Sequence, residues 1–191
     1  MRRWLFSFLL MATVASAQPL QLSVNLTTGG HWLDGAKASA AHDSLALDGG
    51  GFSLGGTLDV FTRVSRFRLG GQFAVDALIS AGSVSVRRSA PLSGGGALTS
   101  ESPDSVLFFS LAPFAGVLFG DGEPFQASLD VLLPVELLAA KVDGARYLSV
   151  VPVPTARLTL AVLVPGLGLE CSVLGSYFGS ARLALAMGLR F

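Results

Sequence analysis

The chain has little with which to build a metal centre or a redox site. It holds a single cysteine, Cys171, so it can form neither an internal disulfide nor a CxxC metal pair. Its two histidines, His31 and His42, make a weak ligand set without paired cysteines, and we expect no metal and no cofactor. The 13 basic and 13 acidic side chains leave no basic surface suited to nucleic acid.

Charge as a whole is scarce, at 14% of the residues, while 51% are hydrophobic. A water-soluble domain of this composition would have difficulty covering its surface, whereas in a membrane barrel lipid covers one face of every strand. Beyond the amino terminus, Gly, Pro, Asp or Ser clusters interrupt every apolar segment before it reaches the ~20 residues of a spanning helix. A membrane location would therefore require strands closed into a barrel, because open strand edges are not tolerated in lipid.

Residues 1–17 have the pattern of a secretory signal peptide. Arg2 and Arg3 precede an apolar run from Trp4 to Val14, and the small residues Ala15 and Ala17 follow, so we expect cleavage before Gln18. As a membrane anchor, the apolar run would reach only ~16 Å of a ~30 Å hydrocarbon core. The sequence thus divides into a cleaved signal, 1–17, and one mature domain, 18–191.

The carboxy terminus alternates strictly between apolar and other residues from Ala181 to Phe191, which is the length and period of a tilted barrel strand. This final strand, ending in phenylalanine, resembles the carboxy-terminal signature of bacterial outer-membrane barrels. In that class the barrel-assembly machinery recognises the terminal strand. The resemblance implies that machinery as a partner and an assembly signal made of Leu185, Met187, Leu189 and Phe191.

The same period of two predicts seven further strands, and no charged residue falls on the face that we assign to the outside. The predicted segments are Leu20–Thr27, Phe52–Val60, Phe67–Ile79, Leu107–Val117, Phe125–Leu137, Leu148–Leu160 and Leu167–Val173. The connections alternate between short turns (62–66, 120–124, 164–166) and connections that are mostly longer (33–50, 82–104, 139–146, 175–179). The expected fold is all-β: a closed, up-and-down, antiparallel transmembrane β-barrel of about eight strands with both mature termini in the periplasm.

The predicted inner face carries five acids and four bases. A barrel of about eight strands is just wide enough for side chains to fill it, and buried charges persist when they are paired. We therefore expect a salt-bridged plug, although the same residues would also suit a gated ion path or a proton relay. The predicted barrel-interior charge network consists of Asp59, Arg68, Asp76, Asp130, Glu136, Arg157, Glu170, Arg182 and Arg190.

Two further expectations concern the outer end of the barrel. The amphipathic aromatics Trp32, Tyr147 and Tyr177 lie near predicted strand ends, where an interface belt belongs. Pro152 and Pro154 share parity, so both missing backbone donors face the same neighbouring strand and predict a weak seam there.

In architecture, the mature chain resembles small outer-membrane barrels of the outer membrane protein A or X type, without a periplasmic domain. The resemblance implies a membrane-integral protein of the Gram-negative outer membrane, in contact with outer-membrane lipid, with a structural or surface-interaction role and at most very low, porin-like conductance. The connections 33–50 and 82–104 would then meet any extracellular partner.

Two other functions remain open from the sequence. One is an outer-membrane lipid-modifying hydrolase using His31 or His42. However, the adjacent His42, Asp43 and Ser44 lie in a predicted loop, which is poor geometry for a triad, and we expect no enzyme. The other is a soluble periplasmic, lipocalin-like ligand binder, which would have the opposite polarity, apolar inside.

Overall fold

The computed structural model describes residues 19–40, 43–79, 84–88, 102–120, 124–164, 167–177 and 180–191. Nearly all of them lie in strands, and within these ranges no helix is long and apolar enough to cross a bilayer. The strands are β1 (Gln21–Ala40), β2 (Asp43–Val64), β3 (Phe67–Leu78), β4 (Val84–Arg88), β5 (Ser105–Phe119), β6 (Phe125–Leu132), β7 (Val135–Val142), β8 (Ala145–Pro152), β9 (Thr155–Val164), β10 (Leu167–Tyr177) and β11 (Ser180–Arg190).

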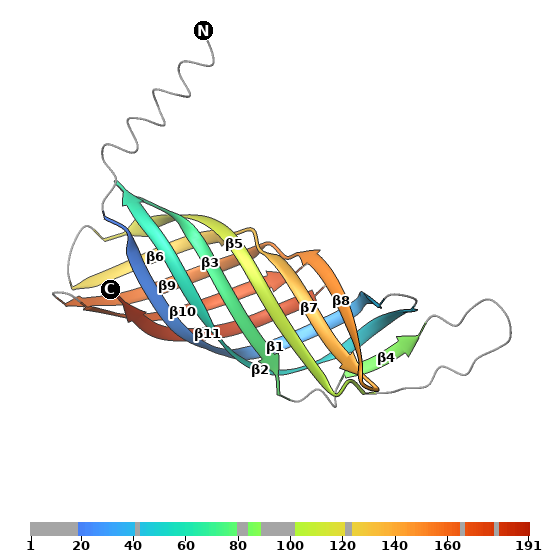
Figure 1. Ribbon diagram of the computed structural model, residues 1–191. Coiled ribbons are helices and arrows are strands. Elements are labelled where there is room, and N and C mark those ends of the chain that lie inside the picture. Colours follow the sequence, from blue (N-terminus) through green and yellow to red (C-terminus); the bar gives the residue numbers. More distant parts are fainter. Residues whose placement is uncertain are drawn as a thin grey trace, which may run out of the picture.

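These elements form one closed antiparallel barrel of eight strands, as the sequence predicts (Figure 1). The closed circuit runs β2-β3-β5-β6-β9-β10-β11-β1 and returns to β2. β4, β7 and β8 continue the barrel strands β3, β6 and β9 respectively. β4 extends the pairing of β3 with β2, and β7 and β8 keep the registers of β6 and β9.

Prolines cause the interruptions between β6 and β7 and between β8 and β9. The backbone ladder continues across both, because Leu133 donates to the Pro113 carbonyl and Val153 to the Pro134 carbonyl, each at 3.1 Å. Pro134 itself cannot donate a return bond to Val153. The hydroxyl of Thr155 supplies a donor instead, 2.9 Å from the Val153 carbonyl oxygen. The two long strands are thus locally weakened without being broken.

We call the half of the barrel nearer the two chain ends the proximal section. Its strands alternate between outward and inward residues as predicted. On β2, Leu58 and Val60 face outward and are about 40% exposed, whereas Thr57, Asp59 and Phe61 face inward and are buried. Both ends of the described chain meet at this end, where Leu22 and Phe191 exchange backbone hydrogen bonds of 3.1 and 2.8 Å. The proximal section therefore has an apolar outer surface and a largely polar interior.

At the opposite end, the structure corrects the prediction of long loops. Residues 33–40 and 43–50 are strand, because β1 and β2 remain paired from Leu33↔Gly49 to Ala40↔Asp43. Residues 84–88 of the predicted loop 82–104 form β4, while 89–101 lie outside the described residues. A β-bulge at Gly35, which has a left-handed φ of 61°, bends β1 at this point, and the Gly35 amide donates to Asp48 at 2.7 Å.

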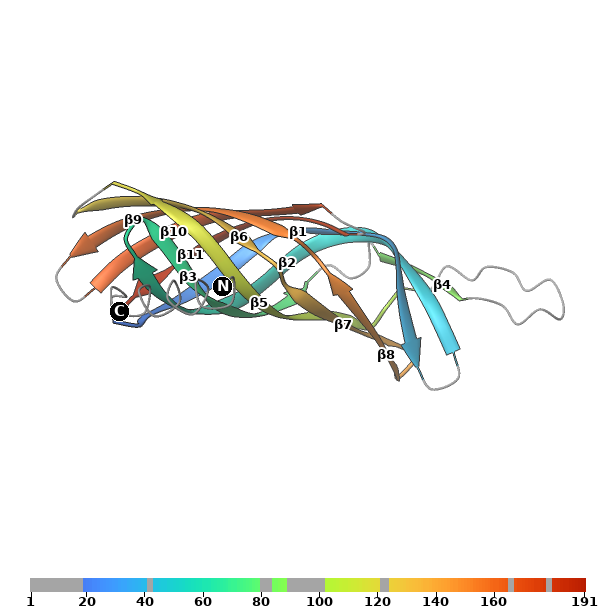
Figure 2. The ribbon, with the colours of Figure 1, turned by 90° about the horizontal axis from the view of Figure 1, so that it is seen from above.

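This far end, which we call the distal section, comprises residues 33–40 of β1, 43–49 of β2, β4, 105–110 of β5, β7 and β8 (Figure 2). Its interior is apolar, because the inward positions of these strands carry mainly aliphatic residues. The buried cluster consists of Leu33, Ala38, Leu45, Leu47, Leu78, Val84, Val86, Val106, Phe108, Leu138, Ala140, Val142 and Tyr147. Asp34, Lys37, Arg87 and Lys141 are exposed on its outside.

Candidate functional site

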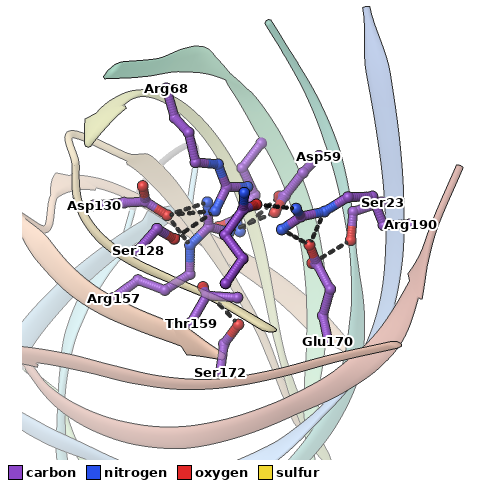
Figure 3. A network of polar contacts seen from close by, with 12 residues as sticks. Ser23, Asp59, Arg68, Ser128, Asp130, Arg157, Thr159, Glu170, Ser172 and Arg190 are labelled. Atoms are coloured by element: carbon purple, nitrogen blue, oxygen red, sulfur yellow. Dashed lines mark hydrogen bonds and ion pairs between the residues drawn. The ribbon is translucent and has the colours of Figure 1, made fainter. Parts of the chain in front are cut away.

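The polar interior of the proximal section contains the charged residues that the sequence analysis singled out, and it is the candidate functional site. At its centre, Arg157 of β9 bridges two carboxylates from opposite sides (Figure 3). Its Nη1 lies 2.5 Å from Asp59 Oδ2, and its Nε lies 3.0 Å from Asp130 Oδ2. Arg68 of β3 contacts the same Asp130 oxygen at 3.3 Å and donates to Ser128 at 2.6 Å.

A second group adjoins the first and involves Arg190, the penultimate residue. Arg190 forms a close ion pair with Glu170 of the neighbouring strand β10 and donates to Gln126 at 2.8 Å. Ser23 of β1 donates to the other Glu170 oxygen at 2.7 Å. Four strands are thus tied together across the lumen, because Gln126 belongs to β6 and Ser23 to β1.

A third group lies nearer the distal section, where Arg182 of β11 contacts Asp76 of β3. Nη2 of Arg182 lies 2.7 Å from Asp76 Oδ2, and Thr27 donates to the other Asp76 oxygen at 2.7 Å. Glu136 of β7 faces inward at the same border and is 6% exposed. Within the described part of the chain, this carboxylate has no hydrogen bond or ion pair, so it is the acid left over when four bases pair with the other four acids.

Small residues make room for these buried groups. A side chain at Gly116 would overlap Asp130, and one at Gly55 would overlap Asp76. The guanidinium of Arg68 lies 4.1 Å from the centroid of the Phe61 ring, a cation–π contact on a side chain that is fully buried. Glycine on one strand and an aromatic ring on another therefore shape the space in which the charges are paired.

His31, the histidine considered for catalysis, lies deep inside the barrel and is 1% exposed. Its ring stacks on Phe108 at a centroid distance of 4.2 Å, and its Nδ1 lies 3.4 Å from the hydroxyl of Ser53. Toward the distal end, the next inward residue of β1 is Leu33, which belongs to the apolar cluster of the distal section. His42 lies outside the described residues.

The predicted interface aromatics differ in their placement. Trp32 faces outward and is 52% exposed, over Gly30 and Gly50, which have no side chain to obstruct its ring. Tyr147 does not belong to an outer belt: it is 4% exposed and packs in the distal cluster. Leu148 and Val150 of the same strand face outward, so the odd-numbered Tyr147 faces inward.

The remaining predicted site residues lie on the last strand or outside the residues that the structure describes. Leu185, Met187, Leu189 and Phe191 are 39–68% exposed on the last strand and its final residue. Tyr177 ends β10, but its side chain lies outside the described part, as do the cleavage-site residues Ala15, Ala17 and Gln18.

The apolar distal interior is the feature that the sequence analysis missed. A signal for it was present in the parity of β2, where Ser53, Thr57 and Asp59 face inward. Continuing the same odd-numbered positions toward the amino terminus places Leu47 and Leu45 inside as well. The strands therefore extend beyond the polar interior, and their inward residues change in character rather than in parity.

Comparison with known proteins places the fold. No protein-family model matches the sequence, and no curated protein matches it. Among solved structures, Neisserial surface protein A (NspA) is similar, with a TM-score of 0.63 at 12% identity over 91% of this chain and 97% of that one. Ail, the attachment invasion locus protein of Yersinia pestis, solved with the heparin analogue sucrose octasulfate, has a TM-score of 0.51 at 12% identity, covering 91% and 100%. The chain thus has the fold of the small eight-stranded outer-membrane barrels.

Proposed function

We propose that this protein is an integral protein of the bacterial outer membrane, with a sealed lumen and a structural or surface-interaction role. Export would use the cleaved signal peptide 1–17, and both mature termini would lie in the periplasm. The observation that carries the proposal is the opposite polarity of the two faces of the proximal section, apolar outside and ion-paired inside. Water could not solvate such an outer face, whereas lipid would.

The distribution of charge on the outside supports the membrane location. Among the described residues, exposed charges occur only near the two ends of the barrel. Arg66 lies in the proximal turn, and the others lie in or beside the distal section: Asp34, Lys37, Arg87, Asp104, Lys141, Asp143 and Arg146. The apolar band lies between these two levels. Phe67, Phe119, Phe125 and Phe191 are more than half exposed toward the proximal end, where an aromatic belt would meet the periplasmic interface.

Two barriers in series support very low conductance. The first is the set of paired charges across the proximal lumen. The second is the cluster of the distal section, whose described side chains are apolar except for the hydroxyl of Tyr147. A gated ion path would need both barriers to rearrange. The exposed last strand suits recognition by the assembly machinery, and the charged distal hairpins, together with the segment 82–104, suit contact with an extracellular partner.

The first test is the gel mobility of the mature chain, boiled and unboiled, from outer-membrane fractions. We expect a shift on boiling, which marks a detergent-resistant barrel, and currents at background level when the same material is inserted into planar bilayers. Recovery of an unshifted chain from the soluble periplasm would contradict the membrane location. Stable open channels would contradict the sealed lumen.

We also propose that the protein is not an enzyme. His31 is held by ring stacking and is covered by apolar side chains, which supports a packing role. Substitution of both His31 and His42 by alanine should leave the lipid A of the producing cells unchanged. A change in lipid A on this substitution would support the hydrolase instead.

A further inference from the structure

Among the described residues, the backbone ladder of the barrel wall is interrupted on the distal side of the β10–β11 hairpin. The β10–β11 hairpin ends at Tyr177 and Ser180, while the strands on either side of it continue into the distal section. β1 pairs with β11 only as far as Leu33↔Ser180 and meets β8 at Ser39↔Leu148. In between, residues 34–38 of β1 have no ladder partner on this edge among the described residues, a stretch of roughly 16 Å at 3.3 Å per residue.

The opposite edge of this opening is formed by residues 149–154, and its prolines fit the position. The amide of Val153 donates to the Pro134 carbonyl, on the side away from the opening. Alternate residues of a strand direct their backbone groups to opposite sides, so the residues before and after Val153 direct theirs toward the opening. These neighbours are Pro152 and Pro154, which have no N–H to leave unpaired. The seam that the sequence predicts at the outer end of this strand is thus an edge protected by proline.

A cavity of about 460 Å³ lies at the foot of the opening, and residues from outward and inward positions line it. Val131, Pro154 and Ala156 contribute outward, exposed side chains, and Gly175 lies at an outward position of β10. Thr155, Ser176 and Arg182 line the same cavity from inward positions. Outward and inward residues thus border one cavity at the open edge of the wall.

Two residues that line the cavity hold buried hydrogen-bond donors without a partner in the described chain. Arg182 uses Nη2 for Asp76, and its Nε has no partner within the described chain. The hydroxyl of Ser176 likewise has none there, whereas that of Thr155 already donates to Val153. The outer side of the cavity, by contrast, is apolar.

The charges nearby select the kind of acceptor. Asp76 neutralises Arg182, and the Glu136 carboxylate interacts electrostatically with both. A phosphate or carboxylate would add negative charge beside two carboxylates. An uncharged carbonyl oxygen, as in an ester or amide, accepts the same hydrogen bonds without that cost.

We propose that this opening docks an acyl chain of the surrounding membrane, whose ester or amide carbonyl accepts hydrogen bonds from Arg182 and Ser176. The chain itself lies over Val131 and Ala156, continuous with the apolar band of the barrel. This proposal rests on the proposed membrane location. It identifies a lipid by its linkage chemistry and places it where, among the described residues, the wall ends beside inward side chains.

The test compares two amphiphiles that differ only in the linkage, a brominated monoacyl glycerol ester and its alkyl ether. Each is titrated into the folded chain starting at Gln18 in an alkyl maltoside detergent. Trp32, the one tryptophan left after Trp4 is removed, pairs across strands with Ala181 next to Arg182 and reports quenching by bromine. We expect saturable quenching by the ester, roughly tenfold tighter than by the ether. Equal affinities, or linear quenching that follows partition into the micelle, would overturn the proposal.

Variants locate the site. A Cβ at Gly175 meets no atom within 4 Å, so Gly175→Leu should fill the cavity without strain and abolish saturable quenching. The matched control is Gly71→Leu, at an outward glycine on β3 where a Cβ would lie 3.9 Å from the Ala112 carbonyl oxygen, and it should bind like the parent chain. Ser176→Ala and Arg182→Gln should each lower the affinity for the ester toward the affinity for the ether. If Gly175→Leu binds normally, the proposal fails.

Comparing boiled and unboiled samples on the gel verifies that every variant is folded. If Arg182→Gln does not fold, Ser176→Ala still tests the proposal, because Ser176 takes no part in the ion pairs. If the chain binds the ester selectively but is absent from outer-membrane fractions, the proposed membrane location is contradicted and the ligand proposal is not. A correctly localised barrel without ester selectivity would break this inference alone.

Discussion

The proximal and distal sections of the barrel are built from the same strands with the same alternation, yet their faces have opposite character. In β2, Leu58 faces outward and Asp59 inward in the proximal section, while Leu45 and Leu47 face inward in the distal section. The backbone is continuous between these positions. The difference shows that parity decides which face a residue occupies, whereas the surrounding solvent decides which residue type is suitable there.

The two interiors also differ in the interactions that stabilise them. In the proximal section, stability depends on complete pairing, because a buried charge is costly when its partner is removed. In the distal section it depends on packing, and a cavity costs according to its volume. The comparison therefore predicts different responses to substitution at the two ends.

The largest effect is expected at Arg157, whose loss leaves the Asp59 and Asp130 carboxylates buried without it. Arg157→Ala should lower the free energy of unfolding in lipid vesicles by about 3–5 kcal/mol, measured by urea titration of Trp32 fluorescence. The exposed Arg146→Ala should change it by less than about 0.5 kcal/mol. Equal effects of the two substitutions would show that the ion pairs do not hold the proximal section.

In the distal section, Leu47→Ala should cost about 2–4 kcal/mol through the cavity that it leaves. The loss should be local, so that the amides of β2 near Leu45 exchange faster while those near Asp59 keep their protection. Hydrogen exchange measured by mass spectrometry distinguishes this outcome from a loss of protection along the whole strand, which would mean that the two sections do not differ.

The outer faces should respond differently to the same charge. Leu58→Lys places an ammonium in the apolar band and should destabilise the barrel in lipid by about 2 kcal/mol. Ser39→Lys, on the exposed face of the distal section, should be close to neutral. Similar values for both in vesicle refolding experiments would contradict the assignment of Leu58 to lipid.

The smallest effect is expected at the border between the sections. Glu136→Gln removes the buried carboxylate that lacks an ion pair and should raise the free energy of unfolding by about 1 kcal/mol. A destabilised Glu136→Gln chain in the same urea titration would indicate that the charge of Glu136 is needed.

The sequence predicts the barrel, its parity and the members of its charge network, because each follows from residues two apart in one strand. The partners of those charges were not predictable: Asp59 meets Arg157 across the lumen, and only the closure of the sheet brings them together. The distal strands were missed because their glycines and polar residues have the composition of loops. Tyr147 was placed outside by its residue type, although the parity of Leu148 and Val150 assigns it to the interior.

The most direct test of the account is a spin-label scan of outward positions along β2 in lipid vesicles, on a Cys171→Ser background. Labels at 54, 58 and 60 should be more accessible to oxygen, which partitions into lipid, than to a water-soluble nickel complex, and the label at 48 should show the reverse. Preference for the nickel complex at all four positions would mean that water, not lipid, surrounds the proximal section, and would contradict the membrane barrel.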